Sequence, residues 1–281
     1  KNSKHVILAG DDDQAIYGWA GADVQRFQDE PAKNIILPQS YRVPQAVQQI
    51  ADQILNRIPD NRRIKKQWAS RPEGGSVDHI TSIEDVPLHE GDWLILARTN
   101  DKLIKLKSIL QEMAIYFEIK GRKSYKTRLY TAVKHYTRWT NGDKLSLSEC
   151  KDLFEFLELE QELKEERMYD LKEFNYSIED QWYEVFKSDP EECLYIREML
   201  RNKEELSKPA RVKLSTIHAA KGGEATNVLL ILDNTKKIRE AVDKSEDKHD
   251  EEHRVWYVGV TRTKQNLYIM TPKREDRSYD I

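Results

Sequence analysis

Leu214-Ser215-Thr216-Ile217-His218-Ala219-Ala220-Lys221-Gly222-Gly223-Glu224 is the stretch of sequence that decides the fold. It begins as the apolar, β-branched run of a buried strand, Val212–Thr216, and then passes into a polar turn. A second apolar run, Val228–Leu232, follows soon after the turn. The stretch therefore predicts two buried strands, with a group of polar side chains at the end of the first.

Similar apolar runs recur along the chain, which is the pattern of buried strands in a parallel sheet. The further runs are His5–Ala9, Asn34–Leu37, Trp93–Ala97 and Leu267–Met270. Apolar residues at helical spacing lie between several of them, from Val47 to Ile58, just after Pro44, and from Leu103 to Met113. Strands that alternate with helices predict an α/β fold with a parallel sheet.

Residues 121–209 interrupt this alternation, because they carry helix signals and few strand signals. Ser146 and Glu149 have the spacing of a capping box, and Asp189-Pro190 has the pattern of a helix start. The strand pattern resumes at Arg211. We therefore predict a mostly helical subdomain inserted into the α/β domain. The charge-rich stretch Lys236–Asp250 is predicted to be a solvated loop or a helix.

Composition narrows the class of protein. The 281 residues carry a formal net charge of −3, so any contact with nucleic acid must be local. No apolar run approaches the ~20 residues of a membrane span. The two cysteines, Cys150 and Cys193, indicate a reducing compartment, and no Cys/His group has metal-ligand spacing, so no metal site is predicted.

The stretch Gly10–Ala22 carries the first candidate site residues. Gln14 follows a strand-like run that ends in Gly-Asp, at the sheet edge where α/β folds bind ligands, and its amide could sense a phosphate. Tyr17 and Trp19 lie in a loop rich in Gly and Ala. Such rings can stack on unpaired bases, at about 1–3 kcal/mol per base. The alternative is that both rings belong to the core, and the residues alone leave the two open.

Arginines supply further candidates. Arg42, after Tyr41, and Arg262, at the end of an apolar and aromatic run, offer the permanent charge and rigid donors that suit a γ-phosphate. The alternatives are a surface salt bridge for Arg42 and a pair with Glu251 or Glu252 for Arg262. Arg98 could likewise form a structural ion pair.

The basic segment, residues 121–149, holds seven Lys and Arg against two Asp and Glu, whereas residues 150–207 hold eight against eighteen. Such a mixture of cations and aromatic rings suits a surface that follows phosphates and stacks on bases. The alternative is a helix with a buried aromatic stripe and a solvated basic face. The aromatic residues are Tyr125, Tyr130, Tyr136 and Trp139.

Four segments resemble, in order and in wording, motifs III to VI of superfamily 1 DNA helicases of the UvrD, Rep and PcrA type. They are Gly10–Ala22, Leu37–Arg42, Leu214–Glu224 and Glu251–Arg262. No glycine is followed by lysine, so the phosphate-binding loop of these motors does not occur. We therefore expect the chain to be the back half of a longer motor, without ATPase activity of its own.

The resemblance implies roles for individual residues. The catalytic set is Gln14, Arg42 and Arg262, and the ATP-binding set is Tyr41, Arg42, Gly222, Glu224 and Arg262. Arg98 and Asn100 match a short further motif, and the DNA-binding set is Tyr17, Trp19, Arg98, Asn100, Thr216 and His218. The chain departs from the family at Ala20, Gly223 and Ala225, where Arg, Leu and Phe are usual, which indicates a divergent branch such as a viral one.

The resemblance also implies the domain plan. Residues 1–33 would be the tail of a first RecA-like domain, 34–120 and 210–281 the second RecA-like domain, and 121–209 a reduced helical insertion. ATP and Mg²⁺ would be bound mainly by the preceding domain.

The implied function is that of an ATP-dependent helicase or translocase in DNA repair or replication, moving 3′ to 5′ on single-stranded DNA and opening duplexes. Its partners would be single-stranded DNA, single-strand/duplex junctions and the first RecA-like domain, with no membrane, in the cytoplasm or a host's cytoplasm. Two alternatives stay open: a non-catalytic DNA-binding module, and the motor subunit of a helicase–nuclease complex.

Overall fold

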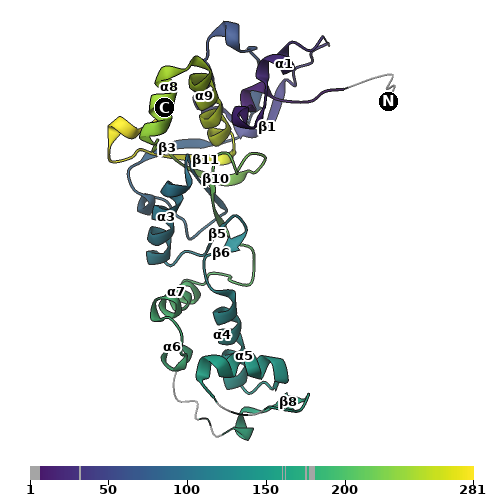
Figure 1. The fold of residues 1–281 in the computed structure, drawn as a ribbon, viewed down its shortest axis with the longest axis vertical. Helices are drawn as coiled ribbons and strands as arrows, with labels where there is room; N and C mark the ends of the chain where they lie inside the picture. The colour runs from purple at the N-terminus through teal and green to yellow at the C-terminus, as the bar shows by residue number, and fades with distance from the viewer. Residues whose placement is uncertain (1–6, 32, 160, 162, 175, 177–180) are drawn as a thin grey trace. The chain divides into compact units, whose positions relative to one another are not determined.

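The computed structural model describes residues 7–31, 33–159, 161, 163–174, 176 and 181–281. The chain forms two compact units (Figure 1). Unit 1 comprises Lys1–Leu106 and Arg211–Ile281, and unit 2 comprises Lys107–Ala210. The sequence predicted an inserted subdomain over residues 121–209. In the structure, unit 2 begins earlier, at Lys107, which lies within the helix Asn100–Glu112.

Unit 1 is built on a parallel sheet, as the alternation of strands and helices predicted. Its strands follow the order β3 (Ser76–Ile80), β11 (Thr263–Met270), β10 (Ala225–Ile231), β4 (Trp93–Ala97) and β9 (Val212–Thr216). Every neighbouring pair among them is parallel. Strand β4 is buried along its whole length, which is expected of a central strand covered on both faces.

Helices complete unit 1. The principal ones are α2 (Gln45–Leu55), α3 (Asn100–Glu112), which continues into unit 2, α8 (Lys236–Lys244) and α9 (Glu246–Val260). Helix α9 packs against α2 and α8 (Figure 1). Its apolar side chains from Val255 to Val260 are buried with those of α2 and β10 in one core. Of the two alternatives for Lys236–Asp250, the helix is therefore correct. The smaller elements are α1 (Val24–Gln28), β1 (Gln39–Pro44), β2 (Ala69–Arg71) and short 3-10 turns.

Two strand predictions in unit 1 are wrong. Residues Ile7–Ala9 and Asn34–Leu37 form no strand, and His5 and Val6 lie outside the described residues. The side chains of Ile35 and Leu37 are 77% and 80% exposed. A strand forms only where a neighbour satisfies its backbone hydrogen bonds, and no described strand pairs with these residues. The strand of this region is β1, which pairs with β2.

Unit 2 is mostly helical, with α4 (Thr127–Thr140), α5 (Leu147–Leu157), α6 (Trp182–Val185) and α7 (Pro190–Arg201) around its own aromatic core. Two small hairpins accompany them, β5 (Phe117–Ile119) with β6 (Arg122–Lys123), and β7 (Leu145–Ser146) with β8 (Met168–Tyr169). The predicted capping box is confirmed, since Ser146 and Glu149 exchange hydrogen bonds of 3.4 and 2.8 Å. Asp189 caps α7 as predicted.

The structure also describes the two cysteines and the apolar character of the helices. The thiols of Cys150 and Cys193 are free and buried in unit 2, as befits small apolar side chains. Among the described residues, no helix is both long and apolar enough to cross a membrane.

Candidate nucleotide and nucleic-acid site

Arg262 brings three of the predicted segments together. It follows α9 and precedes β11, and its side chain is buried. The guanidinium donates to the carbonyl oxygen of Gly223 at 3.3 Å and to the side-chain oxygen of Gln14 at 3.3 Å. Burial, with the nearby charge of Arg42, lowers the pKa of Arg262 to about 10, so the side chain stays charged at neutral pH. The proposed pair with Glu251 or Glu252 is not formed.

Gln14 lies on the 3-10 turn Asp12–Gln14, and both ends of its amide are engaged. Its nitrogen donates to Asp11 Oδ2 at 2.6 Å, and its oxygen accepts from Arg262 Nη2. Because a carboxylate only accepts and a guanidinium only donates, these two neighbours fix which end of the amide faces Arg262. The predicted catalytic residues Gln14 and Arg262, 248 positions apart, are therefore in direct contact.

Arg42 and Glu224 form the second part of this cluster. Arg42 Nη1 lies 3.6 Å from Glu224 Oε2, and Lys264 Nζ lies 2.7 Å from the other oxygen of Glu224. The hydrogen bond from Lys264 and the charges of Lys264 and Arg42 lower the pKa of Glu224. The buried Nε of Arg42 has no hydrogen-bond partner among the described residues. We call Gln14, Arg42, Glu224 and Arg262 the nucleotide-side cluster.

Two more residues were predicted to bind ATP, Tyr41 and Gly222, and one neighbour of Glu224, Lys264, was not predicted. The side chain of Tyr41 is 86% exposed. Gly222 has φ of +89°, in the left-handed region that glycine adopts without strain, so it makes the turn that leads to Glu224. Sequence reasoning missed Lys264; its place two residues after Arg262 was the available signal.

The aromatic residues Tyr17 and Trp19 lie beside the His218 turn. The Tyr17 hydroxyl donates to the carbonyl oxygen of His218 at 2.6 Å, and the two rings are in edge contact at 5.9 Å between centroids. Trp19 contacts Tyr17 edge-on at 6.0 Å, and Lys221 Nζ lies 5.3 Å from the centre of the Tyr17 ring. Lys221 is a further residue that sequence reasoning did not assign. We call Tyr17, Trp19, His218 and Lys221 the aromatic cluster.

Exposure decides between the two interpretations of Trp19. Its side chain is 71% exposed, so Trp19 is not a core residue, whereas Tyr17 is half-buried. Burial lowers the pKa of His218, with the nearby charge of Arg98 acting in the same direction, so this imidazole is neutral at pH 7. A neutral imidazole beside Lys221 offers hydrogen bonding without adding charge.

Of the remaining predicted DNA contacts, Arg98 and Thr216 make contacts within the protein. Arg98 makes a two-point ion pair with Glu252, at 3.0 Å from Nε and 2.8 Å from Nη2 to the same oxygen. Glu252 also accepts from the indole nitrogen of Trp256 at 2.7 Å. Arg98 thus forms a structural ion pair, and its DNA contact stays a prediction. Thr216 caps the turn by accepting from the amide of Ala219 at 3.2 Å, and Asn100 is exposed at the start of α3.

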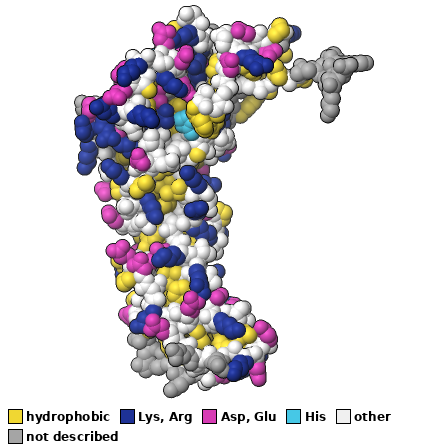
Figure 2. All heavy atoms as spheres, viewed as in Figure 1, with side chains coloured by type: hydrophobic (Ala, Val, Ile, Leu, Met, Phe, Trp, Pro, Cys, Tyr) yellow, Lys and Arg dark blue, Asp and Glu magenta, His cyan; other side chains and the backbone are white. Residues whose placement is uncertain are grey.

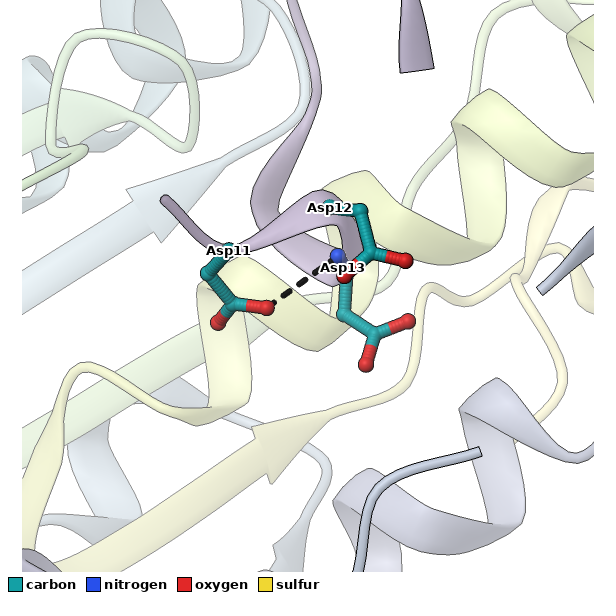
Figure 3. Close-up of side chains that lie close together, drawn as sticks. All are labelled: Asp11, Asp12 and Asp13. Carbon is teal, nitrogen blue, oxygen red and sulfur yellow. Dashed lines mark hydrogen bonds between the residues drawn. The ribbon is translucent and has the colours of Figure 1, made fainter. Parts of the chain in front are cut away.

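Three consecutive aspartates, Asp11, Asp12 and Asp13, lie close together (Figure 3) and precede Gln14 in the chain. Carboxylate oxygens of the three lie within 4.8 Å of one another. The ammonium of Lys66 contacts all three carboxylates, and Arg63 Nε donates to Asp13 at 2.8 Å. The protein's own cations therefore supply the positive charge that these carboxylates require.

The basic segment, residues 121–149, does not present most of its aromatic rings for base stacking, as one of the two interpretations predicted. Tyr125, Tyr136 and Trp139 are buried in the unit's core, so the base-stacking interpretation is wrong for them. Arg128 pairs with Glu155, and Arg138 pairs with Glu149. On the face that Figure 2 presents, Lys and Arg side chains alternate with Asp and Glu over this unit. The buried aromatic stripe is therefore correct, and a DNA contact of the basic face stays a prediction.

Comparison with known proteins gives the family. The family model of the UvrD-like helicase C-terminal domain matches residues 97–274, more than half of the chain. The ATP-dependent DNA helicase PcrA of Staphylococcus epidermidis RP62A is 26% identical over 168 residues, which cover 51% of this chain and 23% of that protein. PcrA of Staphylococcus aureus Mu50 matches with the same identity and coverage. The aligned stretch thus spans under a quarter of the length of these relatives.

A solved structure also matches. It is the C-terminal domain of a possible DNA helicase from Lactobacillus plantarum WCFS1, at 13% identity and a TM-score of 0.25, over 83% of this chain and 88% of that one. The match to the family model, and the helicase-like segments that the fold brings together, agree. The chain belongs to the family of UvrD-like helicases and carries their C-terminal domain.

Proposed function

We propose that the chain is the C-terminal part of an ATP-dependent DNA helicase or translocase of 3′ to 5′ polarity. Unit 1 would supply a second RecA-like motor domain, with residues 1–33 completing a first one, and unit 2 would be a reduced helical insertion. ATP and Mg²⁺ would be held mainly by that first domain.

One observation carries this proposal. Gln14 contacts Arg262, and Arg42 pairs with Glu224. Arg262 joins the two pairs by donating to the carbonyl oxygen of Gly223, the neighbour of Glu224 in the chain. Two arginines beside a glutamine amide suit a γ-phosphate, because they neutralise charge that develops as the phosphoryl group is transferred, while the amide orients the attacking water. Glu224 would accept a hydrogen bond from a sugar hydroxyl.

The aromatic cluster would bind single-stranded DNA. Trp19 presents an exposed ring for base stacking, and Lys221 can approach a phosphate. The two clusters share the segment Gly10–Ala22, since Gln14 contacts Arg262 and Tyr17 contacts His218 three residues later. A shift of this segment on ATP hydrolysis would therefore move the aromatic cluster that binds the DNA.

The test is DNA-stimulated ATP hydrolysis by the full-length protein and its Arg262→Ala variant. We expect the variant to lose about 10³-fold or more in kcat and to bind ATP with nearly unchanged affinity, because the arginine acts on the transition state. Lys273→Ala, a change near the end of unit 1, serves as a matched cation control. Wild-type turnover in Arg262→Ala would contradict the assignment, and a full-length protein without ATPase activity would favour the non-catalytic DNA-binding alternative.

A further inference from the structure

Lys66 lies outside the helicase-like segments and contacts three carboxylates next to Gln14. It belongs to the basic run Arg62-Arg63-Ile64-Lys65-Lys66, which follows α2 and a short turn. Its ammonium lies 2.6 Å from Asp11 Oδ1 and 3.1 Å from Asp13 Oδ2, and it also contacts Asp12. The side chain is only 19% exposed, so these contacts are largely shielded from water.

Lys66 begins a chain of contacts that ends at Arg262. Asp11 receives the lysine on one carboxylate oxygen and the Gln14 amide nitrogen on the other, both at 2.6 Å. The Gln14 oxygen then accepts from Arg262 Nη2 at 3.3 Å. The hydrogen bond to Asp11 holds the amide nitrogen of Gln14 away from Arg262, so the amide oxygen faces the guanidinium.

The charges around Asp11 explain why a cation is needed. Asp12 and Asp13 are buried beside it, and Arg63 binds Asp13 and not Asp11. Without Lys66, repulsion from the neighbouring carboxylates would drive the Asp11 side chain to turn outward. The Gln14 amide could then rotate and set its own N–H donors against the donors of Arg262, which repel them.

We propose that Lys66 is a positioning residue for hydrolysis, which acts through Asp11 and Gln14 to orient Arg262. The inference rests on the proposed function, because the arginine is taken to act on the γ-phosphate. Lys66 itself touches neither nucleotide nor DNA in this account. Its loss should consequently alter the rate of the chemical step and leave both binding steps nearly unchanged.

The test compares Lys66→Met, Lys66→Arg and the matched control Lys65→Met in the full-length protein. Lys65 is the adjacent lysine, exposed and paired only with the exposed Asp60 among the described residues. We expect Lys66→Met to lower DNA-stimulated kcat by about tenfold with KM for ATP and DNA affinity within about twofold. Lys66→Arg should restore most of the rate, and Lys65→Met should match the wild type.

A double-mutant cycle separates positioning from a merely structural role. Asp11→Ala should lower kcat on its own, and Lys66→Met should add little in the Asp11→Ala background, since both changes break one chain of contacts. Additive losses, or a parallel loss of kcat, ATP affinity and melting temperature, would show a structural role and overturn the proposal. If Lys66→Met does not fold, Asp11→Ala decides alone, and wild-type kcat in that variant overturns the proposal.

The proposed function can fail separately from this inference. Should Arg262→Ala keep its activity, the nucleotide-side assignment fails and the positioning role fails with it. Should Arg262→Ala lose activity while Lys66→Met and Asp11→Ala keep full kcat, only the role of Lys66 is wrong.

Discussion

Trp19 and Trp139 show how two similar stretches of sequence can serve opposite purposes. Both tryptophans lie among Tyr residues, in stretches for which base stacking and core packing were both open. The Trp19 side chain is 71% exposed, whereas that of Trp139 is fully buried in the core of unit 2. Composition alone therefore does not distinguish a stacking surface from a core.

Spacing does distinguish them. The buried residues of α4 are Leu129, Ala132, Val133, Tyr136 and Trp139, at the three- and four-residue intervals of one helix face. Tyr17 and Trp19 have no such periodic partners, and they lie in a short turn that contains Gly18 and ends at Gly21, where φ is +87°. An aromatic ring outside any apolar period is the better candidate for a ligand contact.

The largest effect that separates the two regions is expected from Trp139→Ala. Removal of a fully buried indole should destabilise unit 2 by about 3–5 kcal/mol, because a large cavity is left in its core. Denaturant unfolding followed by circular dichroism measures this loss. Single-stranded DNA affinity per folded molecule should not change; weaker DNA binding without loss of stability would place Trp139 on a DNA surface.

Arg98→Met should give the next largest effect. Glu252 would be left buried without its cation, which costs about 3 kcal/mol of folding stability. Arg98→Met combined with Glu252→Gln should recover part of that loss, because no buried charge remains. DNA affinity should be unaffected in both variants. Reduced DNA affinity at unchanged melting temperature would instead support the DNA contact predicted for Arg98.

The basic segment of unit 2 provides a smaller effect. Four cations of this segment would be replaced together by Glu. We expect the slope of log K against log salt concentration, for binding to a forked DNA, to fall by about one for each phosphate contact that is lost. Because Arg128 is already paired with Glu155, and Lys126 lies 4.0 Å from Asp189, we expect fewer than four units. An unchanged fork affinity would leave this face as solvated surface only. The positions are Arg122, Lys123, Lys126 and Arg128.

Much of the fold could be predicted from the sequence, because the buried strands of a parallel sheet are continuous apolar runs. Strands β4 and β9 occupy the predicted residues, and α2 begins directly after Pro44. The failed strand at Asn34–Leu37 is as apolar as the others, but an apolar run forms a strand only beside a partner. Local sequence does not contain that information.

Site residues could be predicted where they belong to a recognisable motif. Residues outside the motifs, which join the site only through the fold, could not be predicted. Gln14, Arg42, Glu224 and Arg262 were named from their segments, and the fold brings them together. The partner Lys66 was not named, because a lysine in a charged chain carries no signal until the carboxylate beside it is known, and Lys264 was indicated only by its place near Arg262. The pairing of Arg98 with Glu252 was open for the same reason.

The most direct test of this account is the affinity of the full-length protein for single-stranded DNA after Trp19→Ala. We expect Kd to rise by roughly 5–150-fold, equal to about 1–3 kcal/mol, for any base sequence and with the salt dependence nearly unchanged. Trp19→Phe, which keeps a ring, should lose less, and neither change should alter the melting temperature. Unaltered affinity together with a large fall in melting temperature would contradict the account, because Trp19 would then be a core residue like Trp139.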